Sequence, residues 1–316
     1  MAVFAVRRLA LLAVSLLLAS ALIFFVLRLL SGDEAQVIAG VQATPAQVQQ
    51  LRHQLGTDRP LLAQYLSWIG GVATGDFGSS ALSGLRVSTE LSQKVAVTGP
   101  LVLGSMVLAV LFAVPVGVWA ALWHRRRVGL GITALSQLGI ALPTLWVGLM
   151  LAIVFAVWLR WLPPQGFPVA GWSRPGRAVA SLVLPCLTLA LSEGAVLLRF
   201  VRSATLGVLS QDFLRTARAT GLTRTGALLR HGLRNAAVPV VSVLGLQIAA
   251  LIVGAIVVEQ VFTLPGVGRM LIADVGNRDL VKVQGEVLLI AAAVLVIGFL
   301  IDLVHRLVDP RLRVAR

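Results

Sequence analysis

The sequence predicts an all-α polytopic membrane protein with six transmembrane helices. Hydrophobic residues make up 58% of the 316-residue chain and charged residues only 13%, whereas a soluble domain carries about 25% charged residues. Uninterrupted apolar stretches recur, each close to the ~20 residues that cross a ~30 Å hydrocarbon layer as a helix. Runs such as Val107–Val114 are apolar on every face, which excludes the alternation of a transmembrane barrel. The predicted spans cover residues 9–30, 98–123, 130–159, 179–202, 236–260 and 286–306.

These spans divide the chain into consecutive segments. The first apolar stretch is longer than the roughly 7–15 residues of a secretory signal, so we expect an uncleaved first span. The expected segments are an N-terminal transmembrane helix (1–30), an extracytoplasmic segment (31–97), a five-helix core (98–306) with a long cytoplasmic loop (203–235), and a cytoplasmic tail (307–316).

The distribution of basic residues predicts that both termini are cytoplasmic. With the N-terminus inside, the cytoplasmic segments hold sixteen Lys and Arg against three acidic residues, and the outer segments hold eleven against nine. Lys and Arg are retained on the cytoplasmic side during insertion. The net charge of +14 is therefore mostly a topology signal. We expect the lipid bilayer as the surrounding medium and no nucleic-acid partner.

Helix signals occur in the extracytoplasmic segment. Thr44, Pro45 and Gln47 have the spacing of a capping box, and an apolar stripe follows that ends at Gly56. A second amphipathic helix is predicted from Pro60 to Ile69, after which the glycines between Gly70 and Gly84 should break regular structure. The residues fit equally well a cap packed on its own helices and a platform for an external partner.

The cytoplasmic connection 203–235 also carries helix signals. Ser210 is expected to cap a short helix that Gly221 ends, and Thr223 to start another. Small residues at Ala217 and Ala219 would let the backbone of a partner approach closely. From these residues alone, a solvated basic loop is the simpler interpretation.

Sequence signatures of catalysis are missing. The lysines Lys94 and Lys282 do not follow a glycine, so the chain has no phosphate-binding P-loop. It also lacks the G-x-S-x-G, H-E-x-x-H and C-x-x-C patterns, and Cys186 is the only cysteine. We therefore expect no catalytic residue, cofactor or metal site in this chain.

Polar residues inside the predicted spans are the candidates for a pathway. Interhelical hydrogen bonding explains Gln137 and Gln247, because a polar group left unpaired in hydrocarbon costs several kcal/mol. Glu193 is more costly still, and either lines a pathway or serves as a neutral or paired structural acid. Our hypothesis is that it lines the pathway. The candidate pathway residues are Glu193, Gln137, Gln247 and Thr144, and the prolines expected to bend spans are Pro115, Pro143, Pro185 and Pro239.

The cytoplasmic loop resembles a known family. The stretch from Phe213 to Leu222 (FLRTARATGL), continuing through His231-Gly232-Leu233-Arg234-Asn235, is similar to the EAA loop of binding-protein-dependent ABC importer permeases. More narrowly, it resembles the B-type subunit of the dipeptide and oligopeptide branch. Arg215 stands where the wider superfamily has Glu, and Glu193 where the family usually has a small residue. Further resemblance lies in Leu51-Arg52, Gly75-Asp76-Phe77-Gly78, Leu162-Pro163-Pro164, Glu259–Gly268 and Asp309-Pro310-Arg311.

The resemblance implies the type I importer permease fold, also called the MetI-like fold, in a bacterial plasma (inner) membrane. It implies that the chain forms half of a pathway for di- or oligopeptides and catalyses no reaction. The implied partners are a homologous C-type permease, two ABC ATPases that bind ATP and Mg, and an extracytoplasmic peptide-binding protein. The residues implied in coupling to the ATPases are Phe213, Leu214, Arg215, Thr216, Ala217, Arg218, Gly221 and Leu222.

Other functions remain alternatives at this point. A related cargo, such as a nickel complex, glutathione or an opine, fits the same resemblance. A polytopic membrane enzyme is less favoured because no catalytic motif is found. An ion channel is also weakened, since the sequence has no charged ring or carbonyl filter.

Overall fold

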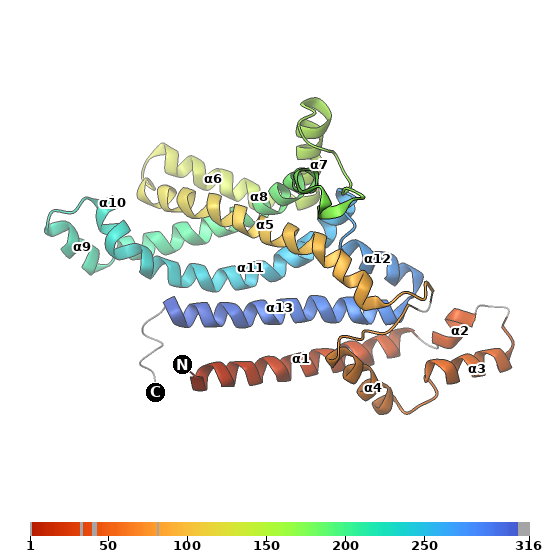
Figure 1. The fold of residues 1–316 in the computed structure, drawn as a ribbon. Helices are drawn as coiled ribbons and strands as arrows, with labels where there is room; N and C mark the ends of the chain where they lie inside the picture. The colour runs from red at the N-terminus through yellow and green to blue at the C-terminus, as the bar shows by residue number, and fades with distance from the viewer. Residues whose placement is uncertain (1, 32–33, 40–42, 81, 309–316) are drawn as a thin grey trace. The chain divides into compact units, whose positions relative to one another are not determined.

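The computed structural model describes residues 2–31, 34–39, 43–80 and 82–308. The predicted Asp309-Pro310-Arg311 ending lies outside the described residues. The chain divides into two compact units (Figure 1). Unit 1 comprises Met1–Ala5, Gly99–Leu264 and Ile297–Arg316, and unit 2 comprises Val6–Thr98 and Pro265–Val296.

Unit 1 contains most of the long apolar helices. Helix α8 lies at its centre and packs against α6, α7 and α11 (Figure 1). Two helices are shared with unit 2: α5 (Val87–Leu122) belongs to unit 1 from Gly99 onward, and α13 (Leu280–Val308) from Ile297 onward. The other elements of unit 1 are α6 (Arg127–Ala141), α7 (Thr144–Leu151) with the π-helical turn η1 (Ala152–Trp158), the 3-10 turn η2 (Gly171–Ser173), α8 (Pro175–Leu209), α9 (Asp212–Ala219), α10 (Arg224–Ala227), the π-helical turn η3 (Leu228–Gly232) and α11 (Leu233–Val261).

Small residues allow these helices to approach closely. A Cβ atom added at Gly117 on α5 would lie 2.8 Å from Val201 on α8. On α6, Ser136 Oγ donates a hydrogen bond to the Ala195 carbonyl oxygen of α8 at 2.9 Å. Within a bilayer, helix association depends on such close packing and interhelical hydrogen bonds, because lipid is as apolar as the helix surface. Small and hydroxyl-bearing residues therefore allow the close packing of the helices at the centre of unit 1.

The third predicted span is interrupted. Residues 130–159 were expected as one helix, but α6 ends at Ala141 and α7 starts at Thr144, with a bend of 103° between the two halves. Leu142 and Pro143 have extended backbone angles. Proline lacks an N–H donor and disfavours a helical residue before it, so the break falls where the chain has Leu-Pro. The other three candidates, Pro115, Pro185 and Pro239, lie inside continuous helices.

Unit 2 joins the first span to the short helices of the segment predicted to be extracytoplasmic. It contains α1 (Ala2–Ser31), α2 (Glu34–Ala39), α3 (Pro45–Leu55), α4 (Leu61–Ala73), the start of α5, α12 (Val267–Asn277) and the first part of α13. Helix α4 lies beside the outer part of α1 (Figure 1). Phe24 packs edge-on against Tyr65, and the Tyr65 hydroxyl lies 2.9 Å from Ser20 Oγ.

The start and end of α3 follow the sequence signals closely. Thr44 and Gln47 form the predicted capping box, and Gly56 ends α3 in the left-handed conformation with φ +67°. The predicted break at Gly70 is wrong, because α4 continues through Gly70 and Gly71 to Ala73. At Gly71 the chain folds back so closely that a Cβ atom would lie 2.9 Å from the Asp76 carbonyl oxygen.

The membrane-crossing helices agree with the predicted class. Among the described residues, five helices are long and apolar enough to cross a bilayer, and the bent α6 and α7–η1 pair gives a sixth if it counts as one span. These helices extend beyond the predicted spans. For example, α5 starts at Val87 rather than at residue 98, so part of the predicted extracytoplasmic segment belongs to a long helix.

Candidate functional site

The connection between α8 and α11, predicted to be cytoplasmic, contains the two short helices α9 and α10 at one end of unit 1 (Figure 1). The expected Ser210 cap is wrong: Ser210 ends α8, its hydroxyl donates back to the Gly207 carbonyl oxygen, and Gln211 starts α9. Thr223 caps α10 as predicted, accepting from the Gly226 N–H at 3.1 Å. Gly221 lies between the two helices with φ +97°, where a side chain would strain the backbone.

Helix α9 has one face packed on its own chain. Leu214 is buried in a cluster with Val208, Leu228 and Ala236, and Ala217 and Leu222 pack against that cluster. The small-residue side was expected to face a partner, whereas the structure places Ala217 toward the interior. This packing fixes α9 to the end of α8 and the start of α11.

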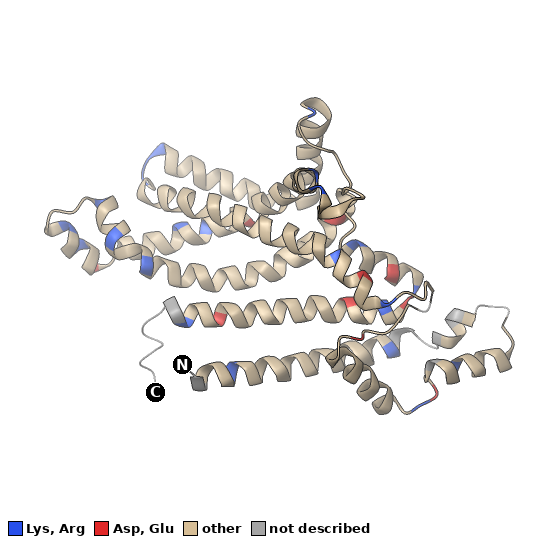
Figure 2. Ribbon diagram, in the orientation of Figure 1, with Lys and Arg blue, Asp and Glu red and all other residues tan. Residues whose placement is uncertain are grey.

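The remaining surface of α9 is exposed. Phe213, with 36% of its surface accessible, and Arg218 flank the packed side, and Arg215 and Thr216 lie farther round the helix. Arg215 forms an ion pair with Asp212 at 3.1 Å, one turn away. Figure 2 shows basic residues gathered at this end of unit 1. The surface therefore combines one aromatic anchor with positive charge.

Two of the four predicted pathway residues come together. Gln247 on α11 is buried, and its Nε2 donates to the Glu193 carbonyl oxygen at 2.7 Å and to Glu193 Oε2 at 3.4 Å. Glu193 on α8 is half-buried. Gln137 is exposed on α6 and Thr144 begins α7, so neither joins this pair.

The structure also contains a buried ionic cluster that the sequence did not predict. Within unit 2, Lys282 Nζ on α13 lies 2.5 Å from Glu90 Oε2 on α5 and 3.7 Å from Asp274 Oδ2 on α12. Figure 2 shows both signs of charge on these helices. Asp279 accepts a hydrogen bond from Ser80 Oγ at 2.5 Å. The cluster ties three helices to the loop that follows α4.

Glu286 adds a fourth carboxyl group to this cluster. Its side chain is fully buried and lies beside the carboxyl group of Asp274. Asp274, Lys282 and Asp279 are its charged neighbours. Even so, no group of three or more His, Cys, Asp or Glu in the described part of the chain is arranged to hold a metal ion.

Comparison with known proteins identifies the family. Residues 113–314 match the family described as "Binding-protein-dependent transport system inner membrane component", and residues 1–96 match its N-terminal counterpart. The chain belongs to this family of importer permeases. The two matches leave only residues 97–112 and the last two residues uncovered, so the resemblance noted in the loop 203–235 extends over most of the chain.

Curated relatives agree with this assignment. The permease is 40% identical over 302 residues to the glutathione transport system permease protein GsiC of Salmonella choleraesuis (strain SC-B67), with 95% of each chain covered. It is 38% identical over 310 residues to GsiC of Escherichia coli (strain K12), with 98% of each chain covered. These relatives are transport permeases of ABC importers and not enzymes.

Membership of this family confirms several expectations from the sequence. The chain is a multi-pass permease subunit of a binding-protein-dependent ABC importer, of the inner membrane, and it is not an enzyme. Such a permease works with ATPase subunits and with a substrate-binding protein.

Proposed function

We propose that this permease forms half of the translocation pathway for a small peptide, paired with a homologous C-type permease. Two ABC ATPases, which bind ATP and Mg, and an extracytoplasmic peptide-binding protein complete the importer in this proposal. Both termini face the cytoplasm, because the basic residues concentrate on that side. Alternating access then follows from rocking of the two permeases.

The exposed face of α9 is the proposed contact with an ATPase subunit. The observation that carries this proposal is that α9 is held to its own chain by the buried Leu214 while Phe213 and Arg215 remain exposed. A rigidly held helix transmits motion from a partner to α8 and α11, whereas a solvated loop does not. Aromatic and arginine side chains are the residues most enriched at energetically important contacts. Gly221 and Leu222 belong to the turn that sets the position of α9.

Cross-linking tests this contact directly. Cys186 is buried in α8, so a cysteine introduced at Phe213 is the accessible thiol among the described residues. We expect Phe213→Cys to cross-link to an ATPase subunit in membranes that contain the whole importer. Arg125→Cys, on the exposed connection between α5 and α6, is the matched control and should react with a soluble thiol reagent but give little ATPase adduct. Equal adducts at both positions, or none at Phe213, would contradict the proposal.

The Glu193 and Gln247 pair is the proposed polar lining of the pathway. The amide of Gln247 orients Glu193 through two contacts, and Glu193 is only half-buried. A carboxylate at this depth would attract the ammonium group of a zwitterionic peptide. Gln137 and Thr144 are weaker members of the proposed lining, because neither contacts this pair.

A glutathione-like peptide is the proposed cargo. The relatives of the permease are named for glutathione transport and are aligned over at least 95% of the chain. The assay is uptake of radiolabelled glutathione into proteoliposomes that hold the importer and its binding protein. Competition by unlabelled glutathione but not by a nickel chelate or an opine supports the proposal. Uptake of one of those compounds, or of unmodified dipeptides alone, would overturn the glutathione assignment and leave the importer assignment intact.

A further inference from the structure

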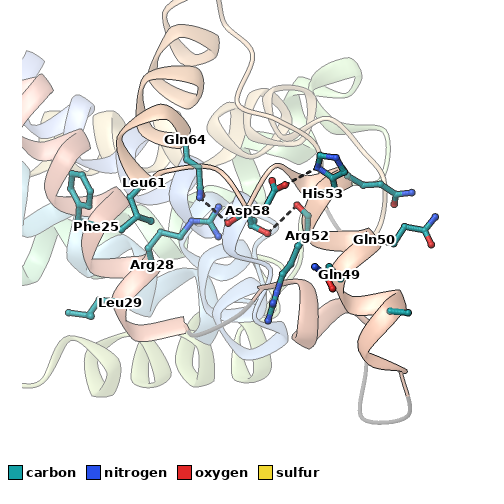
Figure 3. Close-up of a pocket in the computed structure, with 13 residues that line it drawn as sticks. Phe25, Arg28, Leu29, Gln49, Gln50, Arg52, His53, Asp58, Leu61 and Gln64 are labelled. Atoms are coloured by element: carbon teal, nitrogen blue, oxygen red, sulfur yellow. Dashed lines mark hydrogen bonds and ion pairs between the residues drawn. The ribbon is translucent and has the colours of Figure 1, made fainter.

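Unit 2 contains a large hollow between the outer end of α1 and the helices α3 and α4 (Figure 3). Its volume is about 1470 Å³. One part of its lining is apolar, formed by Phe25, Leu29 and Leu61, and the other part is polar, formed chiefly by Arg28, Arg52 and the amides of α3. None of the residues assigned to coupling or to the pathway lines this hollow.

The hollow lies at the level of lipid headgroups. Arg8 and Arg28 are separated by 20 residues of continuous helix α1, and at 1.5 Å per residue this equals ~30 Å, the thickness of the hydrocarbon layer. With Arg8 at the cytoplasmic boundary, Arg28 reaches the outer one. Nearby on α1, Leu22 and Leu29 have 66% and 85% of their surface accessible. The apolar surface of the span therefore continues into the hollow.

The charges in the hollow favour an anion. Arg28 and Arg52 each contribute a positive charge, whereas Asp58 is the one acidic residue among the described residues of the lining, and its Oδ2 lies 2.8 Å from His53 Nδ1. Guanidinium groups bind phosphate through several N–H donors at once.

The polar wall of the hollow is held in shape by its own hydrogen bonds. Gln64 Nε2 on α4 donates to the Thr57 carbonyl oxygen at 3.1 Å and to the Arg59 carbonyl oxygen at 2.7 Å. These bonds fix the turn between α3 and α4, and the dashed lines in Figure 3 mark contacts across it. The turn is therefore held in one conformation, and its backbone as well as its side chains forms the wall of the hollow.

We propose that this hollow binds a phospholipid with an anionic headgroup from the outer leaflet. The phosphate contacts Arg28 and Arg52, and the acyl chains run along Phe25, Leu29 and Leu61. A soluble phosphate would use only the cationic part, and an acidic protein loop would leave the apolar part unexplained. A phospholipid matches both parts and the membrane depth. The proposal does not depend on the identity of the cargo.

The first experiment measures lipid retention. The importer is purified in mild detergent with deuterated phosphatidylglycerol, and the lipid bound per complex is quantified by mass spectrometry. Each basic residue near a membrane surface contributes roughly a fivefold change in affinity for anionic lipid. We therefore expect Arg28→Gln with Arg52→Gln to lower phosphatidylglycerol affinity at least about tenfold, whereas Arg28→Lys with Arg52→Lys retains most binding.

A matched control and competitors make the result decisive. Arg86→Gln removes an exposed arginine of the same unit that does not line the hollow, and it should bind phosphatidylglycerol like the wild type. Phosphatidylethanolamine and soluble glycerol 3-phosphate should compete poorly. Equal lipid retention by the Arg28→Gln, Arg52→Gln protein, or displacement by glycerol 3-phosphate, would overturn the proposal.

Photo-cross-linking identifies the occupant independently. Photo-leucine in place of Leu61 lies in the apolar part of the hollow. An adduct with a phospholipid supports the proposal. An adduct with the binding protein or the second permease, without lipid, would overturn it in favour of a protein contact.

Discussion

Among the proposed pathway residues, Glu193 has the best-defined contacts in the structure. The Gln247 amide contacts both its backbone carbonyl and its carboxylate, and the half-buried side chain retains access to its surroundings. A purely structural acid at this depth would be expected to have more donors, since a charged group in a membrane costs roughly 3 kcal/mol.

The test is Glu193→Gln. Glutamine keeps the size of the side chain and a hydrogen bond to Gln247 but removes the negative charge. If the carboxylate attracts the ammonium group of the cargo, uptake should fall by roughly tenfold, equivalent to about 1.4 kcal/mol, at unchanged amounts of membrane-inserted protein. Initial uptake rates in proteoliposomes measure this. Unchanged rates in a well-assembled importer would make Glu193 a structural residue.

Lys282 is the residue on which the outer ionic cluster depends. It is the ammonium group between Glu90 and Asp274. Removing one partner of a buried ion pair costs about 3–5 kcal/mol, because the remaining charges have no compensation. Lys282→Met should therefore lower the Tm of the purified importer by several degrees.

Two further variants serve as comparisons for this prediction. Lys94→Met changes the only other lysine, which is half-exposed and outside the Lys282 ion pairs, and should leave the Tm nearly unchanged. Glu286→Gln replaces a buried carboxyl group beside Asp274 with an uncharged amide of the same size, so the Tm should stay close to that of the wild type. A Tm drop for Lys94→Met equal to that for Lys282→Met would argue against a specific cluster.

At the scale of single helices, close packing of α5 on α8 is the feature most sensitive to small changes. An added Cβ at Gly117 would lie 2.8 Å from Val201 and 3.0 Å from the Leu198 carbonyl oxygen, and backbone does not move aside easily. Gly117→Ala should destabilise the protein by about 1–3 kcal/mol. Gly131 on α6 has open space around it, so Gly131→Ala is the control and should be neutral or stabilising in thermal melts.

Helix α9 gives a second test at this scale. Phe213→Asp changes the exposed face and should abolish uptake and cargo-stimulated ATP hydrolysis while the Tm stays close to that of the wild type. Ala217→Glu places a charge against the Leu214 cluster, so it should lower both the Tm and the activity. If Phe213→Asp transports normally, α9 is not the coupling helix.

Local signals determined which elements could be predicted from the sequence. The capping box of α3 and the Thr223 cap of α10 involve residues within three positions of each other, and both were predicted. Ser210 failed as a cap because its hydroxyl bonds back to Gly207 in the preceding helix. Pro143 was expected to bend a span, and the chain does bend there, but the sequence did not predict that the bend would reach 103° and divide the span into two helices.

The proposed functional surfaces were likewise predictable from the sequence only in part. The role of the α9 stretch in coupling was predicted from its family resemblance. Which of its residues face inward could not be predicted, because Leu214 and Ala217 pack on residues of α8, η3 and α11. The ionic cluster brings Glu90 next to Lys282, almost 200 positions later, and no local pattern indicates such a contact. Distant pairings of this kind require the structure.

At the scale of the whole molecule, the permease is one part of a larger machine. Its match to the importer family runs from residue 1 to residue 314 with a short gap, and its relatives align over almost their full length. Permeases of this family work with ATPase subunits, which supply the energy for transport. The central claim is therefore that the chain acts only within an ATP-driven assembly.

The most direct test of this claim is purification of the chain in mild detergent from its native membrane, followed by mass spectrometry and an ATPase assay. We predict a homologous second permease and P-loop ATPases in the same complex, with ATP hydrolysis stimulated by the loaded binding protein. A chain that elutes alone or as a homo-oligomer, without ATPase activity, would contradict the account.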